Sequence, residues 1–155
     1  MRATPDGLVL AATDLSNFLA CPHRSTLDFA AVLGQIEVPH SLLDEHTRLL
    51  RERGAAHERD YVQHLRSGGL AVIEVPQEGT PDSRVKATIA ALQSGVDVVY
   101  QGAFAGQGWV GYADILRKAA TPTGSPSAFG DFHYEPYDTK LARETRGGTI
   151  LQLAL

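Results

Sequence analysis

The stretch Tyr134–Arg143, with the sequence YEPYDTKLAR, places charged side chains within a segment that otherwise has the character of a β-strand. Side chains on a strand alternate between its two faces, so Asp138 and Lys140 share one face with Tyr134. Burial of a carboxylate or an ammonium is costly unless a partner or a metal compensates it. A solvent-exposed ion pair is the simpler interpretation, and such pairs contribute roughly 0–1 kcal/mol. The pattern Asp-x-Lys is informative only together with the rest of the chain.

Length and composition indicate an ordinary globular domain. The chain has 155 residues, and its apolar runs fall well short of the ~20 residues that span a bilayer. Its first residues lack the apolar core of a signal peptide. A single cysteine, Cys21, excludes an internal disulfide. We therefore expect one cytoplasmic domain over residues 1–155 with no membrane partner.

The formal net charge of −4 does not favour a nucleic-acid partner, because phosphate binding usually depends on basic surface. It does not exclude one either, since a metal-dependent site requires acidic residues. Basic residues cluster within residues 48–59 and 143–146, and we expect those of the first cluster on a solvated helix face. The chain ends within the apolar run 150–155, which indicates a domain cut short at its C-terminus.

Periodicity and breakers predict a mixed α/β fold, with a central mixed β-sheet flanked by helices. Helices are expected at 15–19, 22–33, 41–66 and 81–92, with Thr13 or Asp14 capping the first and Ser41 or Asp44 the third. Strands are expected at 8–10, 70–75, 96–104, 109–117 and 133–142. Gly106-Gln107-Gly108 predicts a hairpin, and residues 119–130 predict a loop.

Two further segments carry a polar group where the pattern predicts an inward position. His57 lies seven residues after Leu50 and four before Tyr61, so helical spacing predicts that it faces inward with them. Asp114 is expected to share one face of the strand predicted at 109–117 with Val110, Tyr112 and Leu116. Each has a simpler explanation taken alone: a core histidine bonded to the backbone, and a strand-end carboxylate that bonds a turn.

The two predicted acidic strands suggest a metal site. If the strands at 109–117 and 133–142 are neighbours, Asp114 and Asp138 approach each other, and two close carboxylates repel unless a cation lies between them. Mg²⁺ takes one or two carboxylates and keeps several waters, while an imidazole ligand favours Mn²⁺. Lys140 beside such a metal would suit positioning of a water or stabilisation of negative charge.

These residues resemble, in their order along the chain, the motifs of the RecB-like branch of the PD-(D/E)xK nuclease superfamily. The resemblance covers roughly residues 13–155 and includes the segment LSNFLACPHR at 15–24. It is carried by His57, the segment GYAD at 111–114, the segment DTK at 138–140, and Gln152. The family's tyrosine one helical turn after the glutamine has no counterpart, because the chain ends first.

The resemblance implies a restriction-endonuclease-like core and a nuclease site. The metal ligands would be His57, Asp114 and Asp138, with the backbone carbonyl of Thr139 also available. Lys140 would be the catalytic lysine, and Gln152, expected on a last helix, would belong to the catalytic set. Cys21 matches the first of four cysteines that hold a [4Fe–4S] cluster in some members. Either the other three lie in a missing C-terminal part, or Cys21 is a buried apolar residue on its helix.

The expected function is a Mg²⁺- or Mn²⁺-dependent deoxyribonuclease acting in DNA repair, recombination or defence. Single-stranded or exonucleolytic cleavage is favoured, with DNA as substrate and a helicase domain or subunit as partner. One alternative is a non-catalytic nucleic-acid-binding or scaffold module of a larger helicase–nuclease. Another is a metal-dependent hydrolase acting on a different phosphate ester.

Overall fold

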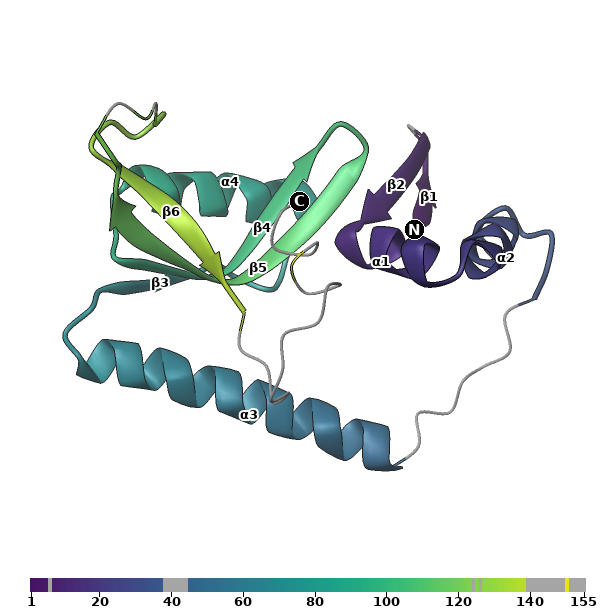
Figure 1. The fold of residues 1–155 in the computed structure, drawn as a ribbon, viewed down its shortest axis with the longest axis horizontal. Helices are drawn as coiled ribbons and strands as arrows, with labels where there is room; N and C mark the ends of the chain where they lie inside the picture. Colours follow the sequence, from purple (N-terminus) through teal and green to yellow (C-terminus); the bar gives the residue numbers. More distant parts are fainter. Residues whose placement is uncertain (6, 38–44, 124, 126, 139–149, 151–155) are drawn as a thin grey trace.

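The computed structural model describes residues 1–5, 7–37, 45–123, 125, 127–138 and 150. Across these residues the chain forms a six-stranded mixed sheet and four helices (Figure 1). The strand order is β1-β2-β5-β4-β3, and β6 pairs with β5 beside β2. The predicted mixed α/β architecture, a central mixed sheet flanked by helices, is confirmed.

The N-terminal segment contains β1 (Arg2–Thr4), β2 (Gly7–Ala11), α1 (Ala12–Ala20) and α2 (Pro22–Val32). The predicted N-cap of α1 at Thr13 or Asp14 is wrong, because the helix already begins at Ala12. Asp14 instead lies in the first turn and accepts hydrogen bonds from the Ala11 N–H at 2.8 Å and the Met1 ammonium at 2.6 Å. Burial raises the pKa of Asp14, but these two partners outweigh it and lower the pKa overall.

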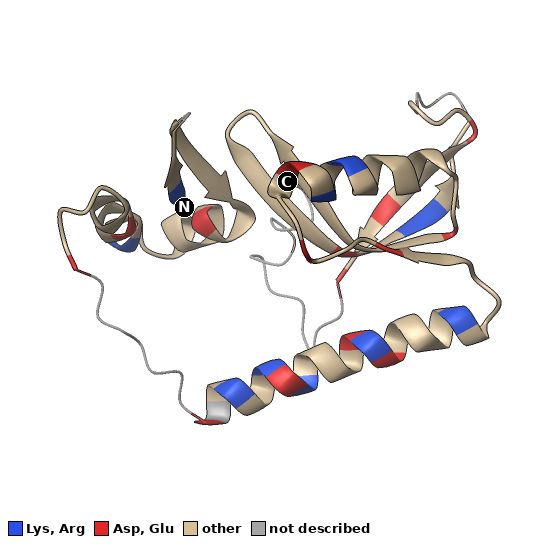
Figure 2. Cartoon of the chain, turned by 180° about the vertical axis from the view of Figure 1, so that it is seen from behind, with Lys and Arg blue, Asp and Glu red and all other residues tan. Residues whose placement is uncertain are grey.

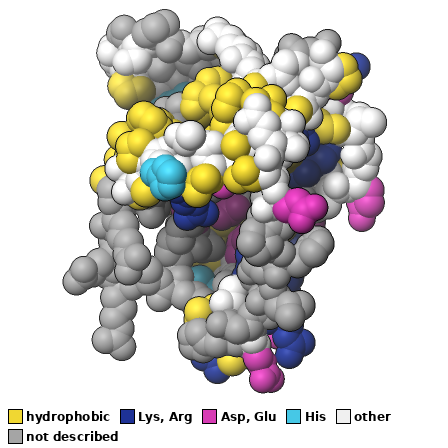
Figure 3. Space-filling model, turned by 90° about the vertical axis from the view of Figure 1, so that its right-hand side faces the viewer, with side chains coloured by type: hydrophobic (Ala, Val, Ile, Leu, Met, Phe, Trp, Pro, Cys, Tyr) yellow, Lys and Arg dark blue, Asp and Glu magenta, His cyan; other side chains and the backbone are white. Residues whose placement is uncertain are grey.

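Helices α1 and α2 leave large apolar side chains on the surface. Figure 3 shows hydrophobic side chains gathered on the face of the molecule that these helices form. From α1 to residue 37, the exposed large apolar residues are Phe18, Leu19, Leu27, Phe29, Leu33 and Ile36.

The long helix α3 (Glu45–Ser67) lies across one face of the sheet (Figure 1). Its C-terminal half packs Val62 and Leu65 against Val98 and Ile115 of the sheet. Figure 2 shows basic and acidic residues along much of the helix, and the arginines within 48–59 are exposed as predicted. Its predicted caps, Ser41 and Asp44, lie outside the described residues.

The other face of the sheet is covered by α4 (Pro81–Gln93), which follows β3 (Val72–Glu74). Thr80 caps the helix by accepting a hydrogen bond from the Ser83 N–H, and Pro81 occupies the first helical position, where its missing N–H costs nothing. Ala91 and Leu92 of α4 pack against Val99 and Leu116 of the sheet. The two faces of the sheet therefore carry separate cores.

Strand β5 (Trp109–Ala120) lies at the centre of the sheet and pairs with three other strands. It forms the predicted hairpin with β4 (Val98–Gly106) along one edge. Its other edge is shared by two strands: β2 pairs in parallel with Trp109 and Val110, and β6 (Phe132–Tyr137) pairs antiparallel with residues 115–120. Residues 111–114, which contain the predicted GYAD motif, lie between these two pairings.

None of the described helices combines the length and the apolar character needed to cross a bilayer.

Candidate functional site

The two predicted acids lie side by side in the register of the sheet. The last pair between β5 and β6 is Ile115 with Tyr137, so the next positions along the same register are Asp114 and Asp138. Both residues are half-buried. The predicted pairing of these strands is confirmed, although β6 ends at Tyr137 and Asp138 follows directly after it. Thr139 and Lys140 lie outside the described residues.

Gln101 of β4 lies opposite Asp114 on the other edge of β5. The register runs from Tyr100 with Ile115 to Gly102 with Ala113, which leaves Gln101 facing Asp114 between these two pairs. Gln101 has φ 60°, a left-handed conformation that residues other than glycine rarely adopt. Gln101 of β4, Asp114 of β5 and Asp138, directly after β6, therefore occupy successive positions in one register, which we call the acid row.

The alternation of side chains is interrupted at this row. Ala113 and Leu116 pack against the same core cluster, the one beneath α4, although their spacing of three residues would place them on opposite faces of a regular strand. Ile115 packs into the cluster beneath α3. The prediction that placed Asp114 on one face with Leu116 assumed regular alternation, which does not hold here.

Helix α3 contacts the acid row through Glu58. The Gln101 side-chain amide donates a hydrogen bond to the Glu58 carboxylate. Tyr100, the neighbour of Gln101 in β4, also bonds Glu58; burial first, and then this bond, raise the pKa of Tyr100 to about 12. Sequence reasoning missed both Glu58 and Gln101. Glu58 lies four residues before Val62 and seven before Leu65, a spacing that could have identified it as inward-facing.

The predicted inward position of His57 is wrong, because the residue is exposed. The prediction took Leu50 and Tyr61 as the buried stripe, yet Leu50 is 48 % exposed while Val62 is 2 % exposed. The face centred on Val62 and Leu65 turns Glu58 towards the sheet. Each residue advances a helix by about 100°, so the preceding residue, His57, is turned away from that face.

The donor set fits a divalent cation in part. Two carboxylates on adjacent strands suit Mg²⁺, which binds one or two carboxylates and keeps several waters. The structure does not bring His57 to them: within the described ranges, no three His, Cys, Asp or Glu side chains form a group that could hold a metal. The described residues therefore do not form the predicted three-residue ligand set, and Asp114 and Asp138 remain as a candidate pair at adjoining register positions.

The predictions for Cys21 and Gln152 stand differently against the structure. Cys21 is exposed between α1 and α2, so its interpretation as a buried apolar residue on a helix is wrong. Its assignment to an iron–sulfur cluster stays a prediction. Gln152 and the last helix predicted around it lie outside the described residues.

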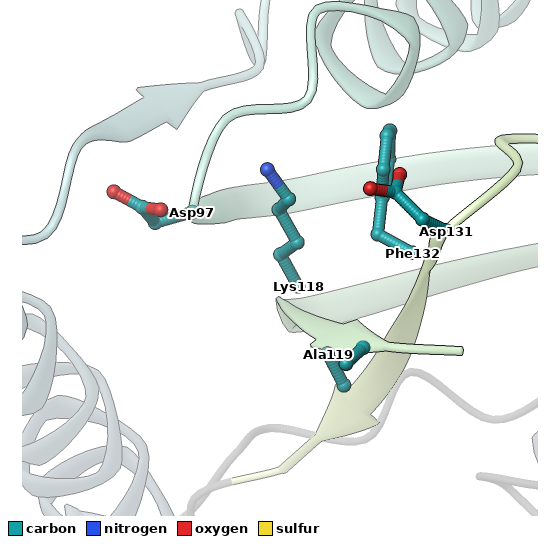
Figure 4. A pocket seen from close by; sticks show the side chains of 6 residues that line it. Asp97, Lys118, Ala119, Asp131 and Phe132 are labelled. Atoms are coloured by element: carbon teal, nitrogen blue, oxygen red, sulfur yellow. The ribbon is translucent and has the colours of Figure 1, made fainter. Parts of the chain in front are cut away.

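Two hollows adjoin the sheet. One, of about 360 Å³, lies where β5 meets β6 and is lined by Asp97, Lys118, Asp131 and Phe132 (Figure 4). Its charges are already engaged in part, since Lys118 donates to the Gly95 carbonyl at 2.9 Å and its ammonium lies over the Phe132 ring.

The second hollow, of about 330 Å³, lies between α3 and the sheet, beside Tyr100. Arg59, Gln63 and Arg66 line it from the helix, and Glu74 lines it from β3. An ion pair of 3.7 Å joins Arg66 to Glu74 across it. Polar and basic side chains therefore lie beside Tyr100, which directly precedes Gln101 in β4.

No family model, curated protein or solved structure matches the chain. The sequence motifs and the geometry of the acid row are therefore the basis for a functional proposal.

Proposed function

We propose that this chain is a divalent-metal-dependent nuclease that hydrolyses phosphodiester bonds of DNA. The observation that supports it best is that Asp114 and Asp138 occupy the two positions that directly follow the terminal β5–β6 pair, Ile115 with Tyr137, in the same register. Like charges directly opposite each other destabilise a sheet, so such a pair favours a cation between them.

In this proposal Asp114 and Asp138 hold Mg²⁺ or Mn²⁺, and the Thr139 carbonyl is the remaining predicted ligand, because His57 is exposed and turned away from the sheet. When bound, the cation lowers the pKa of a coordinated water and offsets charge on the phosphate. In this proposal Lys140 of the DTK segment orients the water for in-line attack and neutralises charge that develops on the phosphorane-like transition state. Single-stranded DNA is the favoured substrate, and the site would serve repair, recombination or defence beside a helicase.

Titration calorimetry with Mn²⁺ tests the metal site. We expect binding by the wild type, loss of binding in Asp114→Asn and Asp138→Asn, and unchanged binding in the control Asp131→Asn. Asp131 is a suitable control because it is exposed and lies at the opposite end of β6, in the hollow of Figure 4.

A cleavage assay on single-stranded DNA with Mg²⁺ or Mn²⁺ tests the reaction. Cleavage should be lost in Asp114→Ala and in Lys140→Ala. Wild-type cleavage by both variants would refute the assignment. Metal binding without cleavage would redirect the search to other phosphate esters, and absence of metal binding would favour a non-catalytic module.

A further inference from the structure

The strained backbone of Gln101 coincides with the acid row. Among the described residues, Gln101 and Gln107 are the two non-glycine residues with positive φ. Gln107 lies in the tight turn between β4 and β5, where a positive φ is ordinary. Gln101 lies within β4, where a left-handed residue other than glycine is strained and persists only if its surroundings fix it.

The surroundings that fix Gln101 are on α3. Its side-chain amide donates to the Glu58 carboxylate, and the same carboxylate bonds Tyr100. Glu58 is itself held by the packing of Val62 and Leu65, one and two turns further along the helix, against Val98 and Ile115. A hydrogen bond to a charged acceptor is stronger than one between neutral groups, and it offsets the backbone strain.

This conformation affects the strand that carries Asp114. The pairs on either side of the strained residue, Tyr100 with Ile115 and Gly102 with Ala113, enclose Asp114. The alternation of β5 is interrupted at the same position, since Ala113 and Leu116 pack into one cluster. We therefore expect the conformation of Gln101 to affect the direction in which the Asp114 side chain points from β5.

We propose that Glu58 and Gln101 are positioning residues, which hold β4 in its left-handed conformation beside Asp114 and thereby orient that carboxylate towards Asp138. The proposal rests on the proposed metal site and adds to it a support from α3. Removal of a group that orients a metal ligand typically lowers metal affinity about 10–100-fold.

Gln101→Gly separates positioning from stability. Glycine adopts the left-handed conformation without strain, which stabilises the variant. The variant also loses the side-chain hydrogen bond to Glu58, which destabilises it. Because the two effects oppose each other, we expect a melting temperature within about 4 °C of the wild type. We also expect Mn²⁺ affinity, measured by calorimetry, to fall about tenfold or more.

Two further variants complete the test. Gln107→Gly makes the same change in the turn, away from the acid row, and should leave Mn²⁺ affinity unchanged. Glu58→Ala should lower Mn²⁺ affinity by a similar factor to Gln101→Gly. Glu58→Gln keeps an acceptor oxygen and should therefore retain most of the wild-type Mn²⁺ affinity.

The outcomes separate this inference from the proposed function. Tight Mn²⁺ binding by the wild type, with unchanged affinity in Gln101→Gly and Glu58→Ala, would overturn the positioning role and leave the metal site intact. Equal loss of affinity in Gln101→Gly and Gln107→Gly would also overturn it. Absence of Mn²⁺ binding by the wild type would overturn both.

Discussion

Substitution of Thr88 by valine should destabilise the protein more than substitution by serine. Thr88 is fully buried in α4, and its hydroxyl donates to the Arg84 carbonyl and accepts from the Ala103 N–H of β4, each at 2.9 Å. Valine keeps the shape of threonine but removes the acceptor, which leaves the N–H of Ala103 without its partner. A buried donor left in this state costs about 1–3 kcal/mol.

Serine keeps the hydroxyl and loses one methyl group, which costs about 1 kcal/mol. At roughly 2–4 °C per kcal/mol, Thr88→Val should lower the melting temperature by about 2–12 °C, and Thr88→Ser by about 2–4 °C. Differential scanning calorimetry of the three proteins at neutral pH measures both shifts. If Thr88→Val melts at the wild-type temperature, or above Thr88→Ser, this hydrogen bond does not hold α4 to the sheet.

Two other predictions concern β4. Gly102→Ala should destabilise by about 1–3 kcal/mol, because a Cβ there would lie 3.0 Å from Leu116 Cδ1; thermal melts should show no such loss in Gly111→Ala, where nothing lies within 4 Å. Tyr100 has a pKa of about 12 in the folded state against 10.0 as an ordinary tyrosine, so its contribution to stability is full below pH 10.0 and is lost as the pH rises towards 12. Urea midpoints across this range should fall less steeply in Tyr100→Phe, with a residual slope from Tyr134, whose pKa is also raised; identical slopes would contradict the assignment.

Local sequence signals predicted most of the elements. Pro81 marked the start of α4, and Gly106-Gln107-Gly108 marked the hairpin, because these residues restrict the backbone wherever they occur. The pairing of the two acidic strands was also predicted. The pairing of β2 with Trp109 and Val110 was not predicted. It joins residues about a hundred positions apart, so no local sequence pattern indicates it.

The site was less accessible to sequence reasoning. The buried stripe of α3 was assigned from Leu50, which is exposed, and this displaced the inward position from Glu58 to His57. The left-handed conformation of Gln101 depends on the Glu58 carboxylate from a distant helix, so no propensity of the β4 segment predicts it. Long-range contacts of this kind decide side-chain directions that periodicity assumes to be regular.

The place of β2 in the sheet has a consequence for how the protein is made. Its partner residues on β5, Trp109 and Val110, are synthesised long after β2 leaves the ribosome. At about 5–20 residues per second, the interval is on the order of 5–20 s. Until then the edge of β2 that faces β5 lacks its permanent partners, because β1 pairs with the opposite edge of β2. Docking of the N-terminal segment onto the sheet therefore waits for the synthesis of β5.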